Sequence, residues 1–379
     1  MKLLSIASEV FPLVKTGGLA DVAGALPAAL ARYGIETRTL LPGYRGVMAR
    51  IGKARPVHQW TSLFGGPARL HTLASDGLDL LVLDAPHLFD RPGGPYADEN
   101  GRDHADNWMR FAAFSRAAAD IAAGALASFV PDIVQAHDWQ AALALAYMKY
   151  DGCRTPGIIT IHNLAFQGQF GLDVFPALGL PPEAAGIDGV EYYGGVGFLK
   201  AGMNAARAIT TVSPTYAAEI RTPAFGMGLE GLVNARVDVL HGIVNGIDTE
   251  HWNPAADPHI PAQFSAANLK ARARNRVALE ERFGLTPEGF IVAIVSRLTW
   301  QKGMDVLAGA LDTLVGAGIR FAVLGSGEPM IESAFLAAAA RHKGRIGVAT
   351  GYNEPLAHLI QAGADAVLVP SRFEPCGLT

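Results

Sequence analysis

SEVFPLVKTGGLADV, residues 8–22, is the stretch around which the chain is organised. An apolar run, residues 3–7, precedes it, and an alanine- and leucine-rich segment extends from its glycines to residue 32. This order predicts a strand, a glycine turn and a helix. Gly17 and Gly18 at a helix start let the backbone approach a ligand and present free N–H groups, where the helix dipole favours an anion. Lys15 adds a positive charge at the same place, so we expect a phosphate group as the partner.

The bulk composition indicates a two-domain globular enzyme. A chain of 379 residues is too long for one hydrophobic core. Half of its residues are hydrophobic and 17% are charged, which excludes a disordered chain. The net charge of -4, without a long basic run, argues against nucleic-acid or membrane-surface partners. A phosphorylated small molecule or a neutral polymer is compatible with this charge.

The cysteines and the apolar segments predict a cytoplasmic protein. Cys153 and Cys376 are the two cysteines, and they lack metal-ligand spacing, so we expect neither a disulfide framework nor a zinc site. The N-terminal apolar run meets Glu9 too early for a signal peptide. The alanine-rich residues 117–130 contain Asp120 and are too few to cross a bilayer.

Apolar runs that predict strands alternate with helical segments, a pattern typical of parallel α/β proteins. In the first half, these runs cover residues 2–7, 36–41, 57–63, 69–74, 78–83, 132–138, 157–163 and 208–213. The three runs between residues 57 and 83 predict a meander added to the sheet. In the second half, the runs cover residues 290–295, 321–324, 346–349 and 366–369. We therefore predict two doubly wound sheets in tandem with a cleft between them.

Two predicted strands of the first half end in polar pairs, His137-Asp138 and His162-Asn163. The carboxyl ends of parallel strands line the crevice where open α/β sheets bind ligands. A lone histidine or glycine pair in such a place is more often structural. The two polar strand ends, together with the glycine turn beside Lys15, favour a site.

Two further segments of the first half are rich in glycine. Residues 167–197 contain Tyr192 and Tyr193 and predict a long loop, either a binding lid or a plain excursion. Residues 238–248 include Asn245-Gly246 and predict a linker between the halves.

The second half carries the charged residues that suit a sugar nucleotide. Arg297 and Lys302 follow the predicted strand 290–295 and can both reach one diphosphate. Glu374 follows the last predicted strand, and a carboxylate there can hold sugar hydroxyls or a cationic transition state. A dehydrogenase is disfavoured, because the first turn is not G-x-G-x-x-G and Pro42-Gly43 stands where an acidic residue should end the second strand.

Motifs along the whole chain carry a family resemblance. They are KTGGLADV (residues 15–22), HDW (137–139), TIHN (160–163), VNGID (244–248), SRL (296–298), QKG (301–303) and SRFEPCGLT (371–379). With these motifs the chain resembles the bacterial glycogen synthases, retaining glucosyltransferases of the starch synthase type that use ADP-glucose. The resemblance implies the α/β GT-B fold, two Rossmann-like domains at residues 1–242 and 243–379, and neither a cofactor nor a catalytic metal.

The resemblance also implies roles for individual residues. The implied catalytic residues are Glu374, His162, Arg297 and Lys302. The implied ADP-glucose contacts are Lys15, Gly17, Gly18, Asp138, Asn163, Asn245, Tyr352, Cys376, Gly377, Leu378 and Thr379. The implied acceptor side consists of Glu9, Asp21 and Tyr96. The implied reaction moves glucose from ADP-glucose to the 4-hydroxyl of an α-1,4-glucan with retention, either by front-face attack or through a covalent Glu374 intermediate.

The sequence departs from the family pattern at two places. Gln140 follows HDW where the family usually has a second histidine, and we expect a small effect. The chain stops at Thr379 inside the last motif, so we expect an incomplete second domain in a fragment of a longer protein. Apolar surface around residues 321–324 and 366–369 would then be exposed. The functional alternatives are an inactive glucan- or nucleotide-binding fragment, or a GT-B enzyme that uses another nucleotide sugar.

Overall fold

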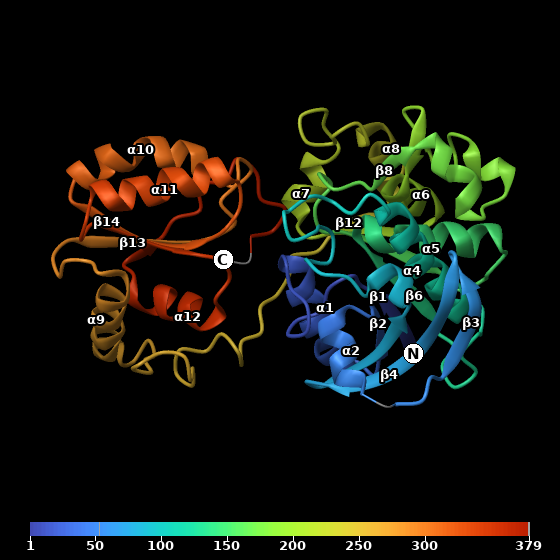
Figure 1. Cartoon of the computed structure of the whole chain (residues 1–379), viewed down its shortest axis with the longest axis horizontal. Coiled ribbons are helices and arrows are strands. Elements are labelled where there is room, and N and C mark those ends of the chain that lie inside the picture. Colours follow the sequence, from blue (N-terminus) through green and yellow to red (C-terminus); the bar gives the residue numbers. More distant parts are fainter. Residues whose placement is uncertain (53, 378–379) are drawn as a thin grey trace. The chain divides into compact units, whose positions relative to one another are not determined.

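The computed structural model describes residues 1–52 and 54–377 and divides the chain into two compact units, Met1–Gly246 and Ile247–Thr379. Both units are α/β, with helices packed on a mainly parallel sheet (Figure 1). Among the described helices, none is both long and apolar enough to cross a membrane.

Within its described residues, the first unit is built on a nine-stranded sheet of order β12-β11-β7-β6-β1-β2-β5-β4-β3. Its strands are β1 (Lys2–Ile6), β2 (Glu36–Pro42), β3 (His58–Leu63), β4 (Gly66–Ser75), β5 (Leu78–Asp84), β6 (Ile133–His137), β7 (Gly157–Ile161), β11 (Ala208–Thr211) and β12 (Leu240–Gly242). The strands from β12 to β5 are parallel, and β4 and β3 continue the sheet antiparallel, which confirms the predicted meander. Strand β12 lies inside the predicted linker, so that part of the linker prediction is wrong.

The order in which strands are added to the sheet reverses at β1, because β2 lies on one side of it and β6 on the other. Ile6 of β1 pairs in register with Leu40 of β2 on one side and with Ala136 of β6 on the other. Ligands of open α/β sheets bind outside the carboxyl ends of strands at such a switch point. The ends of β1, β6 and β7 are therefore the place in this unit where a ligand site is expected.

Helices cover the first sheet and fill the connections between its strands. They are α1 (Gly18–Ala31), α2 (Arg45–Ile51), α3 (Pro86–Phe89), α4 (Asn107–Ala122), α5 (Asp138–Tyr150), α6 (Phe198–Ala205), α7 (Pro214–Glu219) and α8 (Glu230–Ala235), with 3-10 helices at Leu172–Leu178, Pro182–Ala185 and Val237–Val239. Helix α1 begins directly after the glycine turn, as the sequence predicted. Its Leu19 and Ala23 pack with Leu41 and Val82 of the strands, which holds the helix start beside the end of β1.

Residues 167–197 do not form a plain loop. They include a three-stranded antiparallel sheet of β8 (Gln169–Gly171), β10 (Gly195–Gly197) and β9 (Glu191–Tyr192). The prediction failed because strands of two or three residues, rich in glycine, show no apolar alternation.

The second unit has a four-stranded parallel sheet of order β15-β14-β13-β16 within its described residues. Its elements are β13 (Phe290–Val295), β14 (Ile319–Gly325), β15 (Ile346–Thr350), β16 (Ala366–Val367), α9 (Arg272–Phe283), α10 (Met304–Gly316), α11 (Pro329–Arg341), α12 (Glu354–Gly363) and a 3-10 helix at Leu269–Ala271. The predicted strands are confirmed, and the order switches at β13, where β14 lies on one side and β16 on the other.

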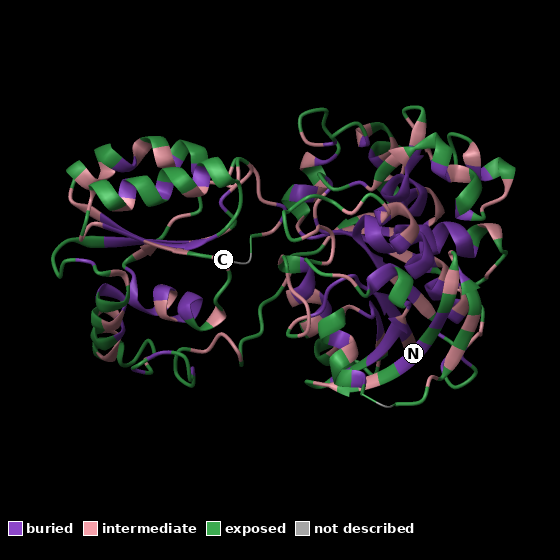
Figure 2. Cartoon of the chain, in the orientation of Figure 1, coloured by how far each residue is buried: buried purple, intermediate pink, exposed green. Residues whose placement is uncertain are grey.

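Both faces of this sheet are covered. Val292 and Phe321 pack against α10 and α11, whereas the alternate residues Ile291 and Ala322 pack against α9 and α12. Figure 2 shows the central strands of the unit as buried. The expected exposure of residues 321–324 is therefore wrong, because helices shield both sides of β14. Exposure around residues 366–369 is confirmed at Val367 and Val369, which are 42% and 48% exposed.

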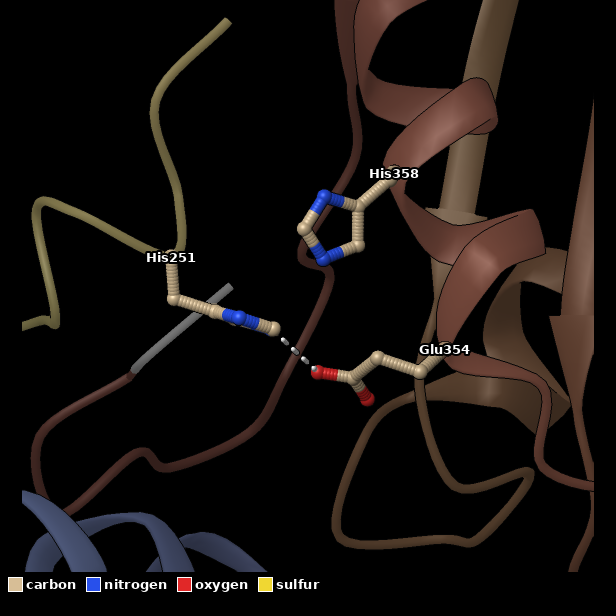
Figure 3. Close-up of side chains that lie close together, drawn as sticks. All are labelled: His251, Glu354 and His358. Atoms are coloured by element: carbon tan, nitrogen blue, oxygen red, sulfur yellow. Dashed lines mark ion pairs between the residues drawn. The ribbon is translucent and has the colours of Figure 1, made fainter. Parts of the chain in front are cut away.

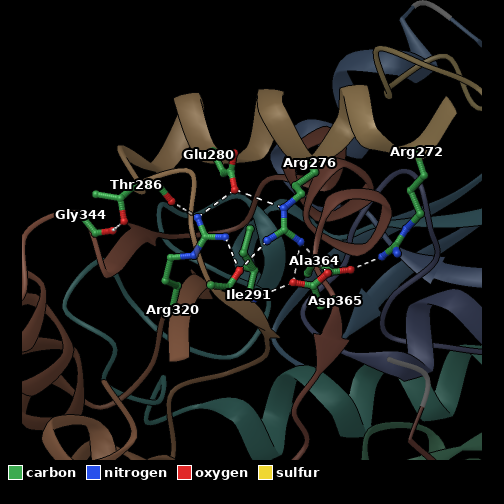
Figure 4. Close-up of polar contacts among 10 residues, drawn as sticks. Arg272, Arg276, Glu280, Thr286, Ile291, Arg320, Gly344, Ala364 and Asp365 are labelled. Atoms are coloured by element: carbon green, nitrogen blue, oxygen red, sulfur yellow. Dashed lines mark hydrogen bonds and ion pairs between the residues drawn. The ribbon is translucent and has the colours of Figure 1, made fainter. Parts of the chain in front are cut away.

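A buried ion-pair network joins α9 to the sheet of the second unit (Figure 4). The fully buried Arg320 guanidinium donates to Glu280 Oε1 at 2.8 Å and to the Gly289 carbonyl at 2.6 Å. Arg276 lies 3.3 Å from the same Glu280 carboxylate and 2.6 Å from Asp365. The network compensates the cost of burying Arg320, so it fixes how α9 packs on the strands.

Candidate active site

In the first unit, Glu9 lies directly beyond β1 and is 3% exposed. Its carboxylate accepts hydrogen bonds from the Thr16 N–H and hydroxyl and from the Tyr96 hydroxyl. The Tyr96 oxygen also lies 2.7 Å from the Ser8 hydroxyl. Burial and the nearby Glu9 charge raise the pKa of Tyr96 well above its usual value, so it remains a neutral donor. These bonds tie the predicted acceptor residues Glu9 and Tyr96 to the glycine turn.

The glycine turn places Lys15 and Asp21 together. The Lys15 ammonium lies 2.8 Å from the Asp21 carboxylate, and both side chains are partly exposed. Gly17 precedes the first residue of α1, and a Cβ at this position would meet no atom within 4 Å. The backbone at the helix start is thus open to an incoming anion.

Two histidines meet at the ends of β6 and β7. His137 Nδ1 lies 2.9 Å from His162 Nε2, and His137 Nε2 lies 3.2 Å from the Ser5 hydroxyl. Burial lowers the pKa of His137 to about 4, and burial together with the neighbouring His137 lowers the pKa of His162 well below its usual value. Both rings are therefore uncharged near neutral pH.

Asp138 supports this pair from the start of α5. Its Oδ1 accepts the His162 backbone N–H at 2.7 Å, and its φ of +54° lies in a region that non-glycine residues rarely adopt. Burial raises the pKa of Asp138 to about 7, although the backbone hydrogen bonds oppose this shift. A carboxyl so placed holds the His162 backbone at a fixed position.

In the second unit, Lys302 and Glu374 form a direct pair. The Lys302 ammonium donates to Glu374 Oε1 at 2.6 Å, and the Ser371 hydroxyl donates to the same oxygen at 2.6 Å. The pair brings together the segment after β13 and the segment after β16, at the switch point of the sheet. Both side chains remain about one-fifth exposed, at 19% and 22%.

Gly303 makes the Lys302–Glu374 contact possible. Its φ is +68°, and a Cβ there would lie 2.1 Å from the Pro370 carbonyl oxygen. The Arg372 N–H also donates to the Gln301 carbonyl at 3.0 Å. Only glycine allows the two segments to approach this closely.

Other predicted residues also follow the strands of the second unit. Arg297 is exposed after β13, and Tyr352 is exposed after β15, where its hydroxyl donates to Glu354. Cys376 is half-buried, and Gly377 is exposed with a φ of +77°. Leu378 and Thr379 lie outside the described residues.

The two predicted asparagines belong to the first unit. Asn163 follows His162, and its side-chain oxygen accepts the Ala165 N–H at 3.0 Å. Asn245 lies in the irregular segment between the end of β12 and the boundary of the units.

Sequence reasoning did not assign roles to several residues that complete these clusters, namely His137, Thr16, Ser8 and Ser371. His137 stands in a polar strand end and was quoted as part of a motif, so a signal for it existed. Thr16 and Ser371 also stand in motifs, but the hydrogen bonds of their hydroxyls depend on how the chain folds around Glu9 and Glu374.

The chain has two Rossmann-like units. Each unit carries a lysine that can bind a phosphate, together with carboxylates, at the switch point of its sheet. This combination indicates a glycosyltransferase of the GT-B fold. The model of the starch synthase catalytic domain family matches residues 2–235. The chain is 61% identical to a glycogen synthase of Mesorhizobium japonicum over 381 residues, covering all of this chain and 79% of the relative. It is 59% identical to glycogen synthase 1 of Rhizobium meliloti, covering all of this chain and 80% of that protein.

A solved structure agrees with these sequence relatives. The catalytic domain of starch synthase IV from Arabidopsis thaliana, bound to ADP and acarbose, matches with a TM-score of 0.89 and 31% identity, covering 99% of this chain and 79% of that one. The chain belongs to the starch synthase catalytic domain family and, within it, to the bacterial glycogen synthases. The resemblance and the GT-B fold expected from the motifs are thereby confirmed, and the protein is a glucosyltransferase.

Proposed function

We propose that this protein transfers glucose from ADP-glucose to the non-reducing end 4-hydroxyl of an α-1,4-glucan, with retention, in glycogen synthesis in the cytoplasm. The observation that carries the proposal is the Lys302–Glu374 pair at the switch point of the second sheet, in a chain 61% identical to a glycogen synthase. The ADP in the Arabidopsis structure supports an adenine nucleotide as the donor group.

In the second unit, the exposed Arg297 and the partly exposed Lys302 would neutralise the donor diphosphate. A diphosphate is a stronger partner for Lys302 than one carboxylate, because it offers more charge and more acceptor oxygens. Glu374 would then turn to the glucosyl ring, with Ser371 still holding one of its oxygens. We assign the sugar hydroxyls to N–H groups of residues 376–379 and the adenine to the exposed Tyr352.

In the first unit, Lys15 and the N–H groups at Gly17 and Gly18 would approach the phosphates, where the helix start favours an anion. His162 would lie beside the glucosyl ring, and Asp138, Asn163 and Asn245 would complete the donor pocket. An uncharged His162 suits this place, since a protonated ring would repel the positive charge that develops at the anomeric carbon. Glu9, Asp21 and Tyr96 would face the acceptor.

The chemical step exchanges one bond for another at the anomeric carbon. The bond from this carbon to the β-phosphate oxygen breaks, the bond to the acceptor 4-oxygen forms on the same face, and the acceptor proton moves to the departing ADP phosphate. With the donor bound, Glu374 would still accept the hydrogen bond of the Ser371 hydroxyl, which lowers its strength as a nucleophile and favours this front-face route over a covalent intermediate. Trapping of a glucosyl–Glu374 adduct would contradict the front-face route.

The proposal is tested by transfer of labelled glucose to glycogen from ADP-glucose, UDP-glucose and GDP-glucose, each without added metal. We expect incorporation from ADP-glucose and much less from the other two donors. Transfer mainly from UDP- or GDP-glucose would overturn the donor assignment. A folded chain that binds ADP or glucan and transfers from no donor would instead be the binding fragment.

A further inference from the structure

A second cluster of polar side chains within the second unit consists of His251, Glu354 and His358. It includes neither Lys302 nor Glu374. One ligand atom from each of the three residues lies within 4.8 Å of those of the other two. Glu354 and His358 are four residues apart on α12, so they share one helix face, and His251 approaches from the segment that opens the unit. Figure 3 shows the three side chains converging on one point, with Glu354 and His251 as an ion pair at 3.7 Å.

The His358 ring is fixed in a state that suits metal binding. Its Nδ1 lies 2.6 Å from Asp257 Oδ2, and an ionised carboxylate only accepts hydrogen bonds, so Nδ1 carries the proton. Asp257 is itself held by the His259 backbone N–H at 2.8 Å. Trp252 stacks on the ring at a centroid distance of 3.8 Å and an interplanar angle of 10°. A carboxylate on the far ring nitrogen is the usual support of a histidine that binds a metal.

The other ring nitrogen of His358 faces the cluster without a partner. The side chain is 1% exposed, and Nε2 has no hydrogen-bond partner among the described residues. A buried acceptor left unpaired destabilises the folded state. In Figure 3, Nε2 is the ring nitrogen turned toward Glu354 and His251, so a cation at this point would satisfy it.

We propose that His251, Glu354 and His358 bind a divalent transition-metal ion of the zinc class. Two imidazoles and one carboxylate are a donor set that Zn²⁺ prefers, whereas Mg²⁺ and Ca²⁺ require oxygen ligands. A tetrahedral Zn²⁺ with bonds of about 2.0–2.2 Å holds its ligand atoms about 3.4 Å apart. The 3.7 Å between His251 and Glu354 is already near this value, and small side-chain rotations close the rest.

The bound ion would join the beginning of the second unit to α12. His251 precedes the long irregular segment that leads to α9, and α12 packs on the sheet through Leu356 and Ile360. The ion would therefore stabilise the second unit by closing a loop of about one hundred residues. None of its ligands is assigned to the chemical step, and the contact with the donor site is the hydrogen bond from Tyr352, assigned to the adenine, to Glu354.

The site is tested on the full chain after metal is removed with a chelator. Zn²⁺ binding is measured by titration calorimetry and by the melting temperature, and Co²⁺ is used as a spectroscopic probe of tetrahedral coordination. The variants are His251→Ala and Glu354→Gln, whose side chains are partly exposed, and Asp257→Asn, which weakens the support of His358. The matched control is His342→Ala, which removes another histidine paired with a carboxylate, 2.7 Å from Asp312 on the surface.

We expect one Zn²⁺ per chain and a melting temperature that rises with Zn²⁺ concentration. Each ligand substitution should weaken binding by about 100-fold or more and Asp257→Asn by about 10- to 100-fold, whereas His342→Ala should leave it unchanged. Absence of binding by the unaltered chain at micromolar Zn²⁺ would overturn the proposal. Binding that survives both ligand substitutions would overturn it as well.

Discussion

The two units place polar groups at the switch points of their sheets in contrasting ways. In the first unit, Glu9, His137, Asp138 and His162 are all less than one-tenth exposed. In the second unit, the Lys302 and Glu374 side chains are about one-fifth exposed, and Arg297 and Tyr352 are exposed outright. The first unit thus holds a buried polar cluster, whereas the charged side chains of the second unit are accessible to water.

This difference fits two separate tasks. Buried groups cannot rearrange when a substrate arrives, so they suit the positioning of reacting atoms. Partly exposed cations exchange water and a carboxylate for a diphosphate at small cost, so they suit the capture and release of a charged donor. We expect substitutions in the second unit to change donor chemistry and substitutions in the buried cluster to change stability and its pH dependence.

The largest expected effect is on transfer, from Glu374→Gln in the second unit. The substitution keeps the shape of the side chain and removes its negative charge, so the transfer rate should fall roughly 1,000-fold. ADP should still bind, because Arg297 and Lys302 remain. Labelled-glucose transfer and calorimetric titration with ADP measure the two effects, and Glu332→Gln on α11 is the matched control. Loss of ADP binding together with a lower melting temperature would show that Glu374 holds the unit together.

The next largest effect is on the stability of the second unit, from Arg320→Met. Removing one partner of a buried ion pair leaves the other uncompensated and costs about 3–5 kcal/mol. The transition of this unit in urea should therefore move to a lower concentration. Arg341→Met is the control, since its ion pair with Asp312 is exposed and should contribute less than about 1 kcal/mol. Equal effects of the two substitutions would show that the network in Figure 4 adds nothing beyond a surface pair.

The buried cluster of the first unit is tested by pH through Asp138→Asn. The pKa of Asp138 is about 7 in the folded protein and about 3.9 in an unfolded chain. The folded state therefore binds this proton more tightly, and its contribution to stability is complete below pH ~4 and is lost as pH rises to ~7. The asparagine side chain does not ionise, so the stability of the Asp138→Asn variant does not have this dependence on pH.

We expect the free energy of unfolding of the unaltered chain, minus that of the Asp138→Asn variant, to fall by a few kcal/mol between pH ~4.5 and ~8. Urea unfolding at the two pH values measures it. His137 has the opposite dependence, because burial lowers its pKa, but it contributes equally to both proteins. A difference that stays constant with pH would show that Asp138 ionises as it does in water.

The smallest expected effect is on donor affinity, from Lys15→Ala in the first unit. Lys15 already pairs with Asp21 and is partly exposed, so its loss should raise the KM for ADP-glucose about tenfold, equal to about 1.4 kcal/mol. The melting temperature should not change, because the side chain contributes little to the core. Lys149→Ala on the exposed end of α5 is the control. Unchanged donor affinity would count against phosphate binding at the glycine turn.

The sequence predicted most of the strands and the polar groups that end them. Buried parallel strands read as short apolar runs, so Val134 and Ile159 mark their strands, and His137 and His162 mark where these strands end. The meander and the four strands of the second sheet followed from the same signal. The glycine turn at the start of α1 was also predictable, because Gly17 and Gly18 stand where a helical segment begins.

The pairings between these polar groups could not be predicted. His137 contacts His162 because β6 lies beside β7, and Lys302 contacts Glu374 because β16 lies beside β13. Apolar periodicity predicts the strands but does not give their order in a sheet. Burial of Phe321 was missed because it depends on helices that arrive from both sides. The cluster of His251 with α12 was missed for the same reason, although Glu354 and His358 are spaced for one helix face.

The reaction itself is tested most directly by the structure of the new glycosidic bond. Glucose labelled with ¹³C at the anomeric carbon is supplied as ADP-glucose with a short α-1,4-glucan acceptor, and the product is read by NMR. We expect one new signal set, from an α-linked glucose on the 4-hydroxyl of the non-reducing end. A β-linked product, or attachment to another hydroxyl, would contradict it.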